Sequence, residues 1–330
     1  MKNRKIIMDD VAERSGSSKT TVSYVLSGKP ANFQISEGTV RRVAETALEL
    51  GYRPCEAQAA LDALEFRRLS ILVLTPWLYA QHSDFMAQLH RAFRDAEERE
   101  SAEFVYMQYH AGQIGKVLRP MVFARYDAVF VSGTSDEDNA YLERNRRKLG
   151  KVILLNRRAE GILSVSGNDR EASRKLAERI CASGNYSRYL VVTDRDSWCS
   201  RDRRDGFLQG LEKFGAEVRV TELSRQDMAA DFREMDGWLG ERGMVFFTQY
   251  YPAAMYLTKQ RNAPKGRGLA CYDEDGLICR FLPKQLTAVN PCHEEMARRA
   301  VELAHRLQEG ESPQSVTVKA KLIRGETVSL

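Results

Sequence analysis

A chain of 330 residues, with 43% hydrophobic and 29% charged residues, is long enough for two or three folded units and typical of a globular protein. The net charge of +5 leans basic, which is compatible with a polyanionic partner. No apolar run approaches the roughly 20 residues of a membrane helix, and no apolar stretch typical of a secretory signal follows Met1. The six cysteines form no C-x-x-C pair, so we expect a cytoplasmic protein with reduced thiols.

Residues Met8 to Leu26 predict two short helices separated by a tight break. Gly16 is placed to end the first helix with positive φ, and Ser17 and Ser18 can cap the second helix. The second helix has an apolar stripe of Val22, Val25 and Leu26. Its remaining face is polar and rich in donors, and comprises Lys19, Thr20, Ser23 and Tyr24. This pattern is typical of a helix-turn-helix that enters the DNA major groove, although a plain pair of core helices shows it too.

A third helix is predicted from Thr39 to Leu50, opened by Ser36 and ended by Gly51. The three helices predict a compact DNA-binding head over residues 1–54. Residues 1–60 contain nine Lys or Arg against seven Asp or Glu. DNA contacts must therefore come from the placement of charges rather than from their number.

A fourth, marginal helix is predicted from Cys55 to Leu64, with Pro54 at its start. This segment is too short to be stable in isolation. It therefore fits a hinge that orders on binding, and equally a passive linker helix. We assign residues 55–68 to this hinge helix and linker.

From Leu69 onward, apolar strands alternate with amphipathic helices. Near-continuous Val, Ile and Leu in the strands favours parallel sheets that are buried on both faces. The predicted strands are Ser70–Leu74, Phe104–Gln108, Ala128–Val131, Val152–Leu155, Tyr189–Thr193, Val218–Glu222, Met244–Thr248 and Gly268–Tyr272. The predicted helices are Phe85–Arg99, Asp138–Leu149, Glu171–Ser183, Asp202–Phe214, Met228–Arg242, Ala253–Gln260 and Glu294–Glu309.

Two runs of this alternation predict an α/β body of two doubly wound lobes over residues 69–330. We expect lobe 1 at about 69–166 plus 292–318, and lobe 2 at about 167–291 plus 319–330. In such sheets ligands lie beyond the carboxyl ends of the strands.

The sequence shows no enzyme motif. The five histidines have no metal-ligand spacing, and there is no P-loop, no G-x-S-x-G and no G-x-G-x-x-G after a strand. We therefore expect no catalytic activity, no metal and no cofactor.

The order of head, hinge and body resembles the lactose-repressor family of bacterial transcription regulators over almost the whole chain. The resemblance rests on DVAERSG, TTVSYVLSGK, ELGYRP and AALDAL in the head and hinge, and on YDAVFVSG, VILLNRR, SRDRRDGF and LTAV in the body. The TTVSYVLSGK run, with a longer loop before Ser36, is most similar to the branch of fructose- and sucrose-responsive regulators. The resemblance implies a two-lobed body like that of periplasmic binding proteins, and a homodimer.

In the head, Lys19 and Thr20 match the family's base-reading positions. Lys can donate to guanine, and Thr can donate, accept or contact a thymine methyl group. Tyr24 stands where many members have Arg, and it cannot make the bidentate guanine contact, so we expect a different operator preference. The remaining DNA-contact candidates suit phosphates, with solvated polar residues as the alternative: Ser18, Thr21 and Ser23.

In the hinge, Leu61 matches the family's leucine lever, which wedges into a central base step of the operator. Many members have Asn, Ala and Arg where this chain has Cys55, Gln58 and Ala59. These differences put the usual minor-groove contacts in doubt. The alternative is that Leu61 is a packed linker residue.

In the body, Arg157, Arg203 and Asp273 match positions where the family holds its effector. Carboxylates hold vicinal hydroxyls, and Arg holds hydroxyls or a phosphate. The candidate walls of the cleft are Trp77, Phe85 and Gln249. An Arg in an α/β loop is more often a surface ion pair, which is the alternative here.

Four arginines crowd one rim of this predicted cleft and favour an anionic effector such as a sugar phosphate, with a free sugar as the main rival: Arg195, Arg201, Arg203 and Arg204. Gln249-Tyr250 and Pro291 differ from the residues that the family has at these positions near the cleft, and these differences indicate an unusual effector or weak binding. We thus expect a dimeric DNA-binding regulator, a repressor of carbohydrate genes, that binds a pseudo-palindromic operator under control of a sugar or sugar phosphate. The alternative is a regulator that responds to a protein partner or has no small-molecule effector.

Overall fold

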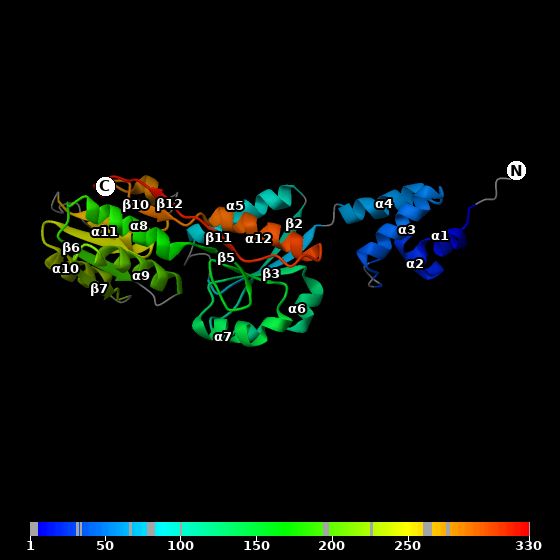
Figure 1. The fold of residues 1–330 in the computed structure, drawn as a ribbon, viewed down its shortest axis with the longest axis horizontal. Helices are drawn as coiled ribbons and strands as arrows, with labels where there is room; N and C mark the ends of the chain where they lie inside the picture. The colour runs from blue at the N-terminus through cyan, green and yellow to red at the C-terminus, as the bar shows by residue number, and fades with distance from the viewer. Residues whose placement is uncertain are drawn as a thin grey trace. The chain divides into compact units, whose positions relative to one another are not determined.

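The computed structural model divides the chain into two compact units, Met1–Arg68 and Leu69–Leu330. Their elements are drawn in Figure 1. No helix of the described residues is long and apolar enough to cross a membrane. The structure describes residues 6–30, 33, 35–65, 68–77, 83–99, 101–193, 198–224, 227–259, 266–274 and 278–329.

The head unit is formed by four helices: α1 (Met8–Ser15), α2 (Lys19–Leu26), α3 (Glu37–Glu49) and α4 (Pro54–Glu65). Gly16 follows α1 with φ of 60°, as the turn requires. The side chain of Ser18 caps α2 by accepting from the backbone N–H of Thr21, and Ser36 caps α3 in the same way. The first three helices surround a small core that includes Val11, Val22, Val25, Val43 and Ala44.

Helix α4 packs within the head unit. Ala57 is fully buried and Ala60 is 8% exposed, and both belong to the head core. Leu61 is half-buried and packs against the same core. The helix that the sequence alone presents as a separate hinge therefore gains its stability from the head, because a short helix needs tertiary packing.

The first lobe of the body is a six-stranded sheet with the order β11-β5-β4-β3-β1-β2, in which all neighbours are parallel. Helices α5 (Ser83–Glu98), α6 (Pro120–Arg125), α7 (Asp136–Asn145) and α12 (His293–Gln308) accompany it. Alternate β1 side chains enter two separate apolar clusters, as expected for a strand buried on both faces. The strands are β1 (Leu69–Thr75), β2 (Ala102–Gln108), β3 (Ala128–Ser132), β4 (Val152–Leu155), β5 (Leu163–Gly167) and β11 (Val316–Val318).

The second lobe is a six-stranded sheet with the order β12-β10-β9-β8-β6-β7. Only β12 runs antiparallel to its neighbour, β10. Its helices are α8 (Asp169–Ala182), α9 (Trp198–Glu212), α10 (Met228–Leu239) and α11 (Tyr250–Lys259). The strands are β6 (Arg188–Thr193), β7 (Glu217–Glu222), β8 (Gly243–Phe247), β9 (Gly268–Tyr272), β10 (Thr287–Asn290) and β12 (Lys321–Ile323).

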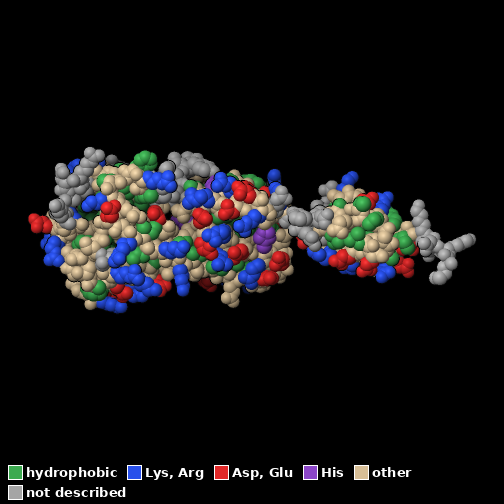
Figure 2. Space-filling model, turned by 90° about the horizontal axis from the view of Figure 1, so that it is seen from above, with side chains coloured by type: hydrophobic (Ala, Val, Ile, Leu, Met, Phe, Trp, Pro, Cys, Tyr) green, Lys and Arg blue, Asp and Glu red, His purple; other side chains and the backbone are tan. Residues whose placement is uncertain are grey.

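The chain crosses between the two sheets three times: after β5, after β10 and after β11. The two parallel-sheet lobes and the helical head confirm the predicted fold class. The face of the body shown in Figure 2 carries acidic and basic side chains interspersed, as is typical of a solvated surface.

Helices α8 and α9 approach each other at two glycines. A Cβ added at Gly206 would lie 2.1 Å from the backbone oxygen of Arg170, and one at Gly210 would lie 2.5 Å from that of Arg174. Close backbone contact of this kind requires a residue without a side chain. It fixes α9, including Arg203, against the start of α8.

We expect Gly206→Ala to lower the free energy of unfolding by about 1–3 kcal/mol, because the backbone of α8 must move. Gly237 in α10 is the matched control, since a Cβ there meets nothing within 4 Å. Gly237→Ala should be neutral or stabilise by up to about 1 kcal/mol through helix propensity. Urea unfolding measures both variants, and equal midpoints would contradict the close packing of α8 and α9.

Candidate functional site

The polar face of α2 lies on the surface of the head. Its apolar residues Val22, Val25 and Leu26 are buried in the head core, and the opposite side carries the candidate DNA contacts. Ser18, Lys19, Thr20 and Ser23 are exposed, whereas Thr21 and Tyr24 are half-buried. The residue types and their exposure therefore fit the predicted recognition helix.

The start of α2 is held in place by short local contacts. The Nζ of Lys19 lies 2.8 Å from a carboxylate oxygen of Asp9 in α1, and both side chains remain largely exposed. The hydroxyl oxygens of Ser18 and Thr21 are 2.9 Å apart, and Ser18 Oγ accepts from the Thr21 amide at 3.0 Å. These contacts orient the N-terminus of α2, where backbone N–H groups favour an anion.

The candidate cleft of the body is marked by three residues that lie one or two positions after strands. Asn156 follows β4, Asp273 follows β9 and Cys292 follows β10, with φ of 52°, 67° and 59°. Left-handed backbone is unusual for residues other than glycine and tends to gather at functional sites. Three such residues at the carboxyl ends of strands mark the place where ligands of this fold class lie.

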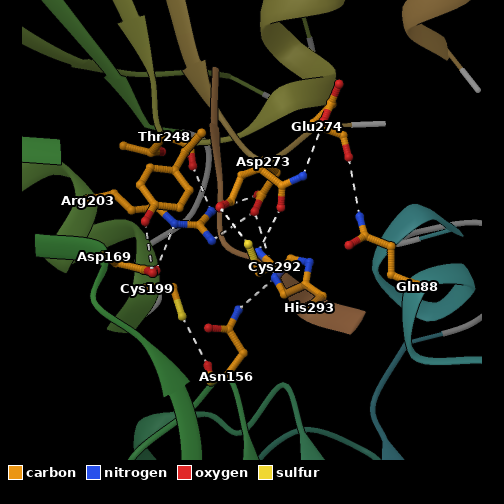
Figure 3. Close-up of polar contacts among 12 residues, drawn as sticks. Gln88, Asn156, Asp169, Cys199, Arg203, Thr248, Asp273, Glu274, Cys292 and His293 are labelled. Atoms are coloured by element: carbon orange, nitrogen blue, oxygen red, sulfur yellow. Dashed lines mark hydrogen bonds and ion pairs between the residues drawn. The ribbon is translucent and has the colours of Figure 1, made fainter. Parts of the chain in front are cut away.

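Arg203 lies at the centre of a buried ion-pair network (Figure 3). Its Nε donates to Asp169 at 3.1 Å, and its two terminal nitrogens donate to the two oxygens of Asp273 at 2.8 and 3.0 Å. The same guanidinium donates to the backbone oxygen of Thr248 and stacks on Tyr272, 4.1 Å from the ring centre. Burial opposes its charge, but the carboxylates of Asp273 and Asp169 raise the pKa of Arg203 well above its usual value.

Arg157 connects the two lobes. Its Nη1 donates to its neighbour Asn156 at 2.7 Å and contacts Cys199 Sγ in α9 at 2.9 Å. Burial raises the pKa of the Cys199 thiol to about 11, so the thiol stays protonated and donates to the Asn156 backbone oxygen at 3.1 Å. The guanidinium of Arg157 also lies over the ring of Trp77, at 5.8 Å.

Three rings form an aromatic wall beside this connection. Phe85 contacts Trp77 edge to face at 5.5 Å, and it contacts His293 in the same way at 4.7 Å. His293 Nε2 lies 3.3 Å from the amide nitrogen of Asn156 and 3.9 Å from Asp273. Figure 3 shows His293, Asn156 and Asp273 pointing toward one another from different elements.

Several buried polar atoms in this region have no hydrogen-bond partner among the described residues. They include Asn156 Oδ1, Arg157 Nε and His293 Nδ1. A buried polar atom without a partner costs free energy, and its presence in a native fold calls for a ligand or water. Because these atoms include both a hydrogen-bond donor and an acceptor, they suit a ligand that can both accept and donate hydrogen bonds.

The burial of His293 predicts a pH-dependent stability. Desolvation, together with the positive charges of Arg203 and Arg157, lowers the pKa of His293 from 6.5 to about 3, although Asp169 opposes this. His293 therefore binds a proton more readily in the unfolded chain than in the folded one. Its contribution to the free energy of unfolding is fully present above pH 6.5 and is lost as the pH falls toward 3. Between pH 7 and pH 5 the loss from this residue should be about 2 kcal/mol.

Urea unfolding at several pH values measures this loss. In His293→Gln, the free energy of unfolding should fall less steeply between pH 7 and pH 5 than in the wild type. An identical pH dependence in the two proteins would show that His293 is not held neutral by its surroundings.

The structure brings together five of the six predicted effector residues. Arg203 contacts Asp273 directly, and Arg157 lies over the ring of Trp77, which contacts Phe85 edge to face. Gln249, the sixth, is half-buried after Thr248.

The rim arginines are engaged in ion pairs. Arg201 contacts Asp136 at 2.9 Å and Arg204 contacts Asp205 at 2.8 Å, while Arg195 lies outside the described residues. Arg201 and Arg204 therefore form ion pairs near the surface, whereas Arg157 and Arg203, for which the sequence left a surface ion pair open, are buried. Their charge gives less support to an anionic ligand than the sequence indicated.

Sequence reasoning missed four residues of the site: Asn156, Asp169, Cys199 and His293. Asp169 precedes a predicted helix and Asn156 follows a predicted strand, so their positions were available as signals. Cys199 and His293 stand alone in the sequence, and no spacing marks them.

Residues 7–55 match the bacterial regulatory proteins of the lacI family, and residues 180–328 match the periplasmic binding protein-like domain. The chain is 22% identical to the catabolite repressor/activator of Escherichia coli strain K12 over 308 residues, which cover 90% of both proteins. It is 22% identical to the sucrose operon repressor of Klebsiella pneumoniae over 95% of this chain and 96% of the relative. It is 26% identical to the fructose operon regulatory protein of Vibrio cholerae over 63% of this chain and 64% of the relative.

Solved structures share the fold. A complex of the transcriptional regulator CelR with cellobiose superimposes with a TM-score of 0.65 at 18% identity, over 98% of this chain and all of that one. The lac repressor dimer bound to operator and an anti-inducer gives a TM-score of 0.65 at 18% identity, over 98% and 99% of the two chains.

The helix-turn-helix head and the two-lobed body are those of DNA-binding transcription regulators, and the relatives are regulators rather than enzymes. The match of residues 7–55 to the lacI-family model and of residues 180–328 to the periplasmic binding protein-like domain confirms the resemblance found in the sequence.

Proposed function

We propose that this protein is a homodimeric repressor that binds a pseudo-palindromic operator and responds to a sugar in the interlobe cleft. The observation that carries the sugar response is the group of buried polar atoms beside Arg203 and Asp273 that have no hydrogen-bond partner among the described residues. As an operator-binding regulator it would act in the cytoplasm, where the chromosome lies.

The charges of the cleft favour a neutral, hydroxyl-rich effector. Two guanidinium groups, Arg157 and Arg203, lie with two carboxylates, Asp169 and Asp273, so the charges of this group balance. A hydroxyl group can accept from Arg157 Nε and donate to Asn156 Oδ1. A sugar phosphate is the rival, and a related regulator from Pseudomonas putida has been solved with fructose 1-phosphate.

Two exposed apolar strands support the proposed dimer. Strand β2 is the edge of the first sheet and exposes Val105 and Met107, while β7 is the edge of the second sheet and exposes Val218 and Val220. Exposed apolar edges invite association with another chain. A second copy covering both edges would pair two heads for the half-sites of a palindrome.

Two measurements test this function. We expect full-length protein to select a twofold-symmetric sequence from random DNA, and to show a higher unfolding temperature with one sugar from a panel containing free and phosphorylated forms. Asymmetric selected sites would contradict the dimeric operator. A response to phosphorylated sugars alone would overturn the neutral effector, and no response to any sugar would favour control by a protein partner.

Leu61 remains the proposed lever at the operator centre. The side chain packs against the head core here, so its removal also tests the alternative of a packed linker residue. We expect Leu61→Ala to lower operator affinity roughly tenfold, because the wedge and the bend that it supports are lost. Gel-shift titration measures affinity and bending, and the sugar-induced thermal shift should stay the same. Unchanged operator affinity would exclude Leu61 from DNA binding.

A further inference from the structure

An aromatic pair lies on the recognition side of the head. The ring of Phe33 stacks on Tyr24 of α2, with ring centres 3.5 Å apart and planes inclined by 6°. Phe33 is 48% exposed and is not part of the head core, whereas Tyr24 is half-buried. A large apolar ring thus remains in solvent instead of packing inside the head.

The backbone between α2 and α3 places this ring. The backbone oxygen of Pro30 accepts from the amides of Phe33 and Ile35, both at 3.2 Å. Ile35 packs against the head core, while Phe33 lies outside on Tyr24. At the other end of the connection, Gly28 has φ of 71° and the Lys29 amide donates to the Tyr24 oxygen at 3.0 Å. The stacked arrangement is therefore set by hydrogen bonds on both sides of Phe33.

Stacking has a direct effect on Tyr24. The Tyr24 side chain turns about two bonds, and a parallel ring against its face limits that rotation. Tyr24 lies four residues after Thr20, so both side chains project from the same side of α2. The phenol of Tyr24 can donate and accept hydrogen bonds. Holding the ring fixes the position of this phenol relative to Lys19 and Thr20.

We propose that Phe33 is a positioning residue for DNA recognition, which holds Tyr24 so that its phenol meets the same base step in every complex. The proposal rests on the proposed operator binding. Phe33 itself offers no hydrogen-bonding group, so it contributes to base preference through Tyr24.

Selection from random-sequence DNA tests the proposal, using full-length wild type, Phe33→Ala, Tyr24→Ala and the double variant. Phe33→Ala should loosen base preference at the same positions as Tyr24→Ala, and the double variant should add nothing at those positions. Affinity of Phe33→Ala for the wild-type site should fall about 2- to 12-fold, as expected for one aromatic pair. Phe33→Tyr keeps the ring, so this variant should have the base preference and the operator affinity of the wild type.

The control is Ile7→Ala, which removes an apolar side chain of similar exposure, 44%, at the start of α1. Its base preference should match the wild type, and thermal unfolding of each variant checks that the head is folded. The proposal would be overturned if Phe33→Ala loosened base preference at other positions than Tyr24→Ala, or if it weakened binding to all sequences alike. A wild-type chain that selects no sequence would instead refute operator binding itself.

Discussion

Replacing Arg203 by Ala should destabilise the body by about 3–5 kcal/mol. Arg203 is 4% exposed, and its guanidinium neutralises Asp273 and also Asp169, whose side chain is fully buried. Removing it leaves one carboxylate buried without its counter-charge and takes a donor from Thr248. Breaking a buried pair from one side typically has an effect of this size.

Chemical unfolding of the body measures this loss. Arg201→Ala is the matched control, because Arg201 sits in the same helix and pairs with Asp136 at the surface. The control should cost less than about 1 kcal/mol. Equal stability of the two variants would contradict the buried network. A lost effector response in Arg203→Ala identifies a ligand contact only if the body remains folded.

The double change Lys19→Ala and Thr20→Ala should lower affinity for the selected operator about 10²- to 10³-fold. Each good contact between a side chain and a base edge contributes about 1–3 kcal/mol of discrimination, and the two residues are exposed at the start of α2. Binding to random DNA should weaken far less, because phosphate contacts elsewhere in the head persist.

Fluorescence anisotropy with operator and random duplexes at several salt concentrations measures both losses. Arg14→Ala serves as the control, since it removes one exposed head charge that pairs with Glu49. The control should reduce binding to both duplexes alike. A double variant that loses no preference for operator over random DNA would show that α2 is not the recognition helix.

The head could be predicted well because its signals are local. Gly16, Ser18 and Ser36 each act within one or two turns of the chain, and the structure uses all three as predicted. The packing of α4 was not predictable in this way. Whether Ala57 and Ala60 face solvent or a core depends on how the other helices assemble.

The body strands with continuous Val, Ile and Leu were predicted close to their observed bounds. Strand β5, with the sequence LSVSG, was missed because two of its five residues are serines, although both are buried. Strands β10, β11 and β12 have only three or four residues each. Such short runs carry too little pattern to be distinguished from loops.

The candidate site was predictable only in part, as single residues and not as a network. Arg203 and Asp273 could each be named from their motifs, yet they are 70 residues apart and their contact depends on the fold. Asp169 adds a second carboxylate that turns a predicted ligand-binding arginine into the centre of an ion-pair network. The neutral state of His293 likewise follows from burial, which its sequence neighbours do not reveal.

The most direct test of effector control is operator affinity measured with and without the sugar that most stabilises the full-length protein. We expect affinity to change by about 5- to 150-fold, the range of ordinary coupling between two sites. In a variant whose operator affinity no longer responds to this sugar, the sugar should also no longer raise the unfolding temperature. Equal operator affinity with and without a sugar that clearly binds the body would contradict control of DNA binding by the cleft.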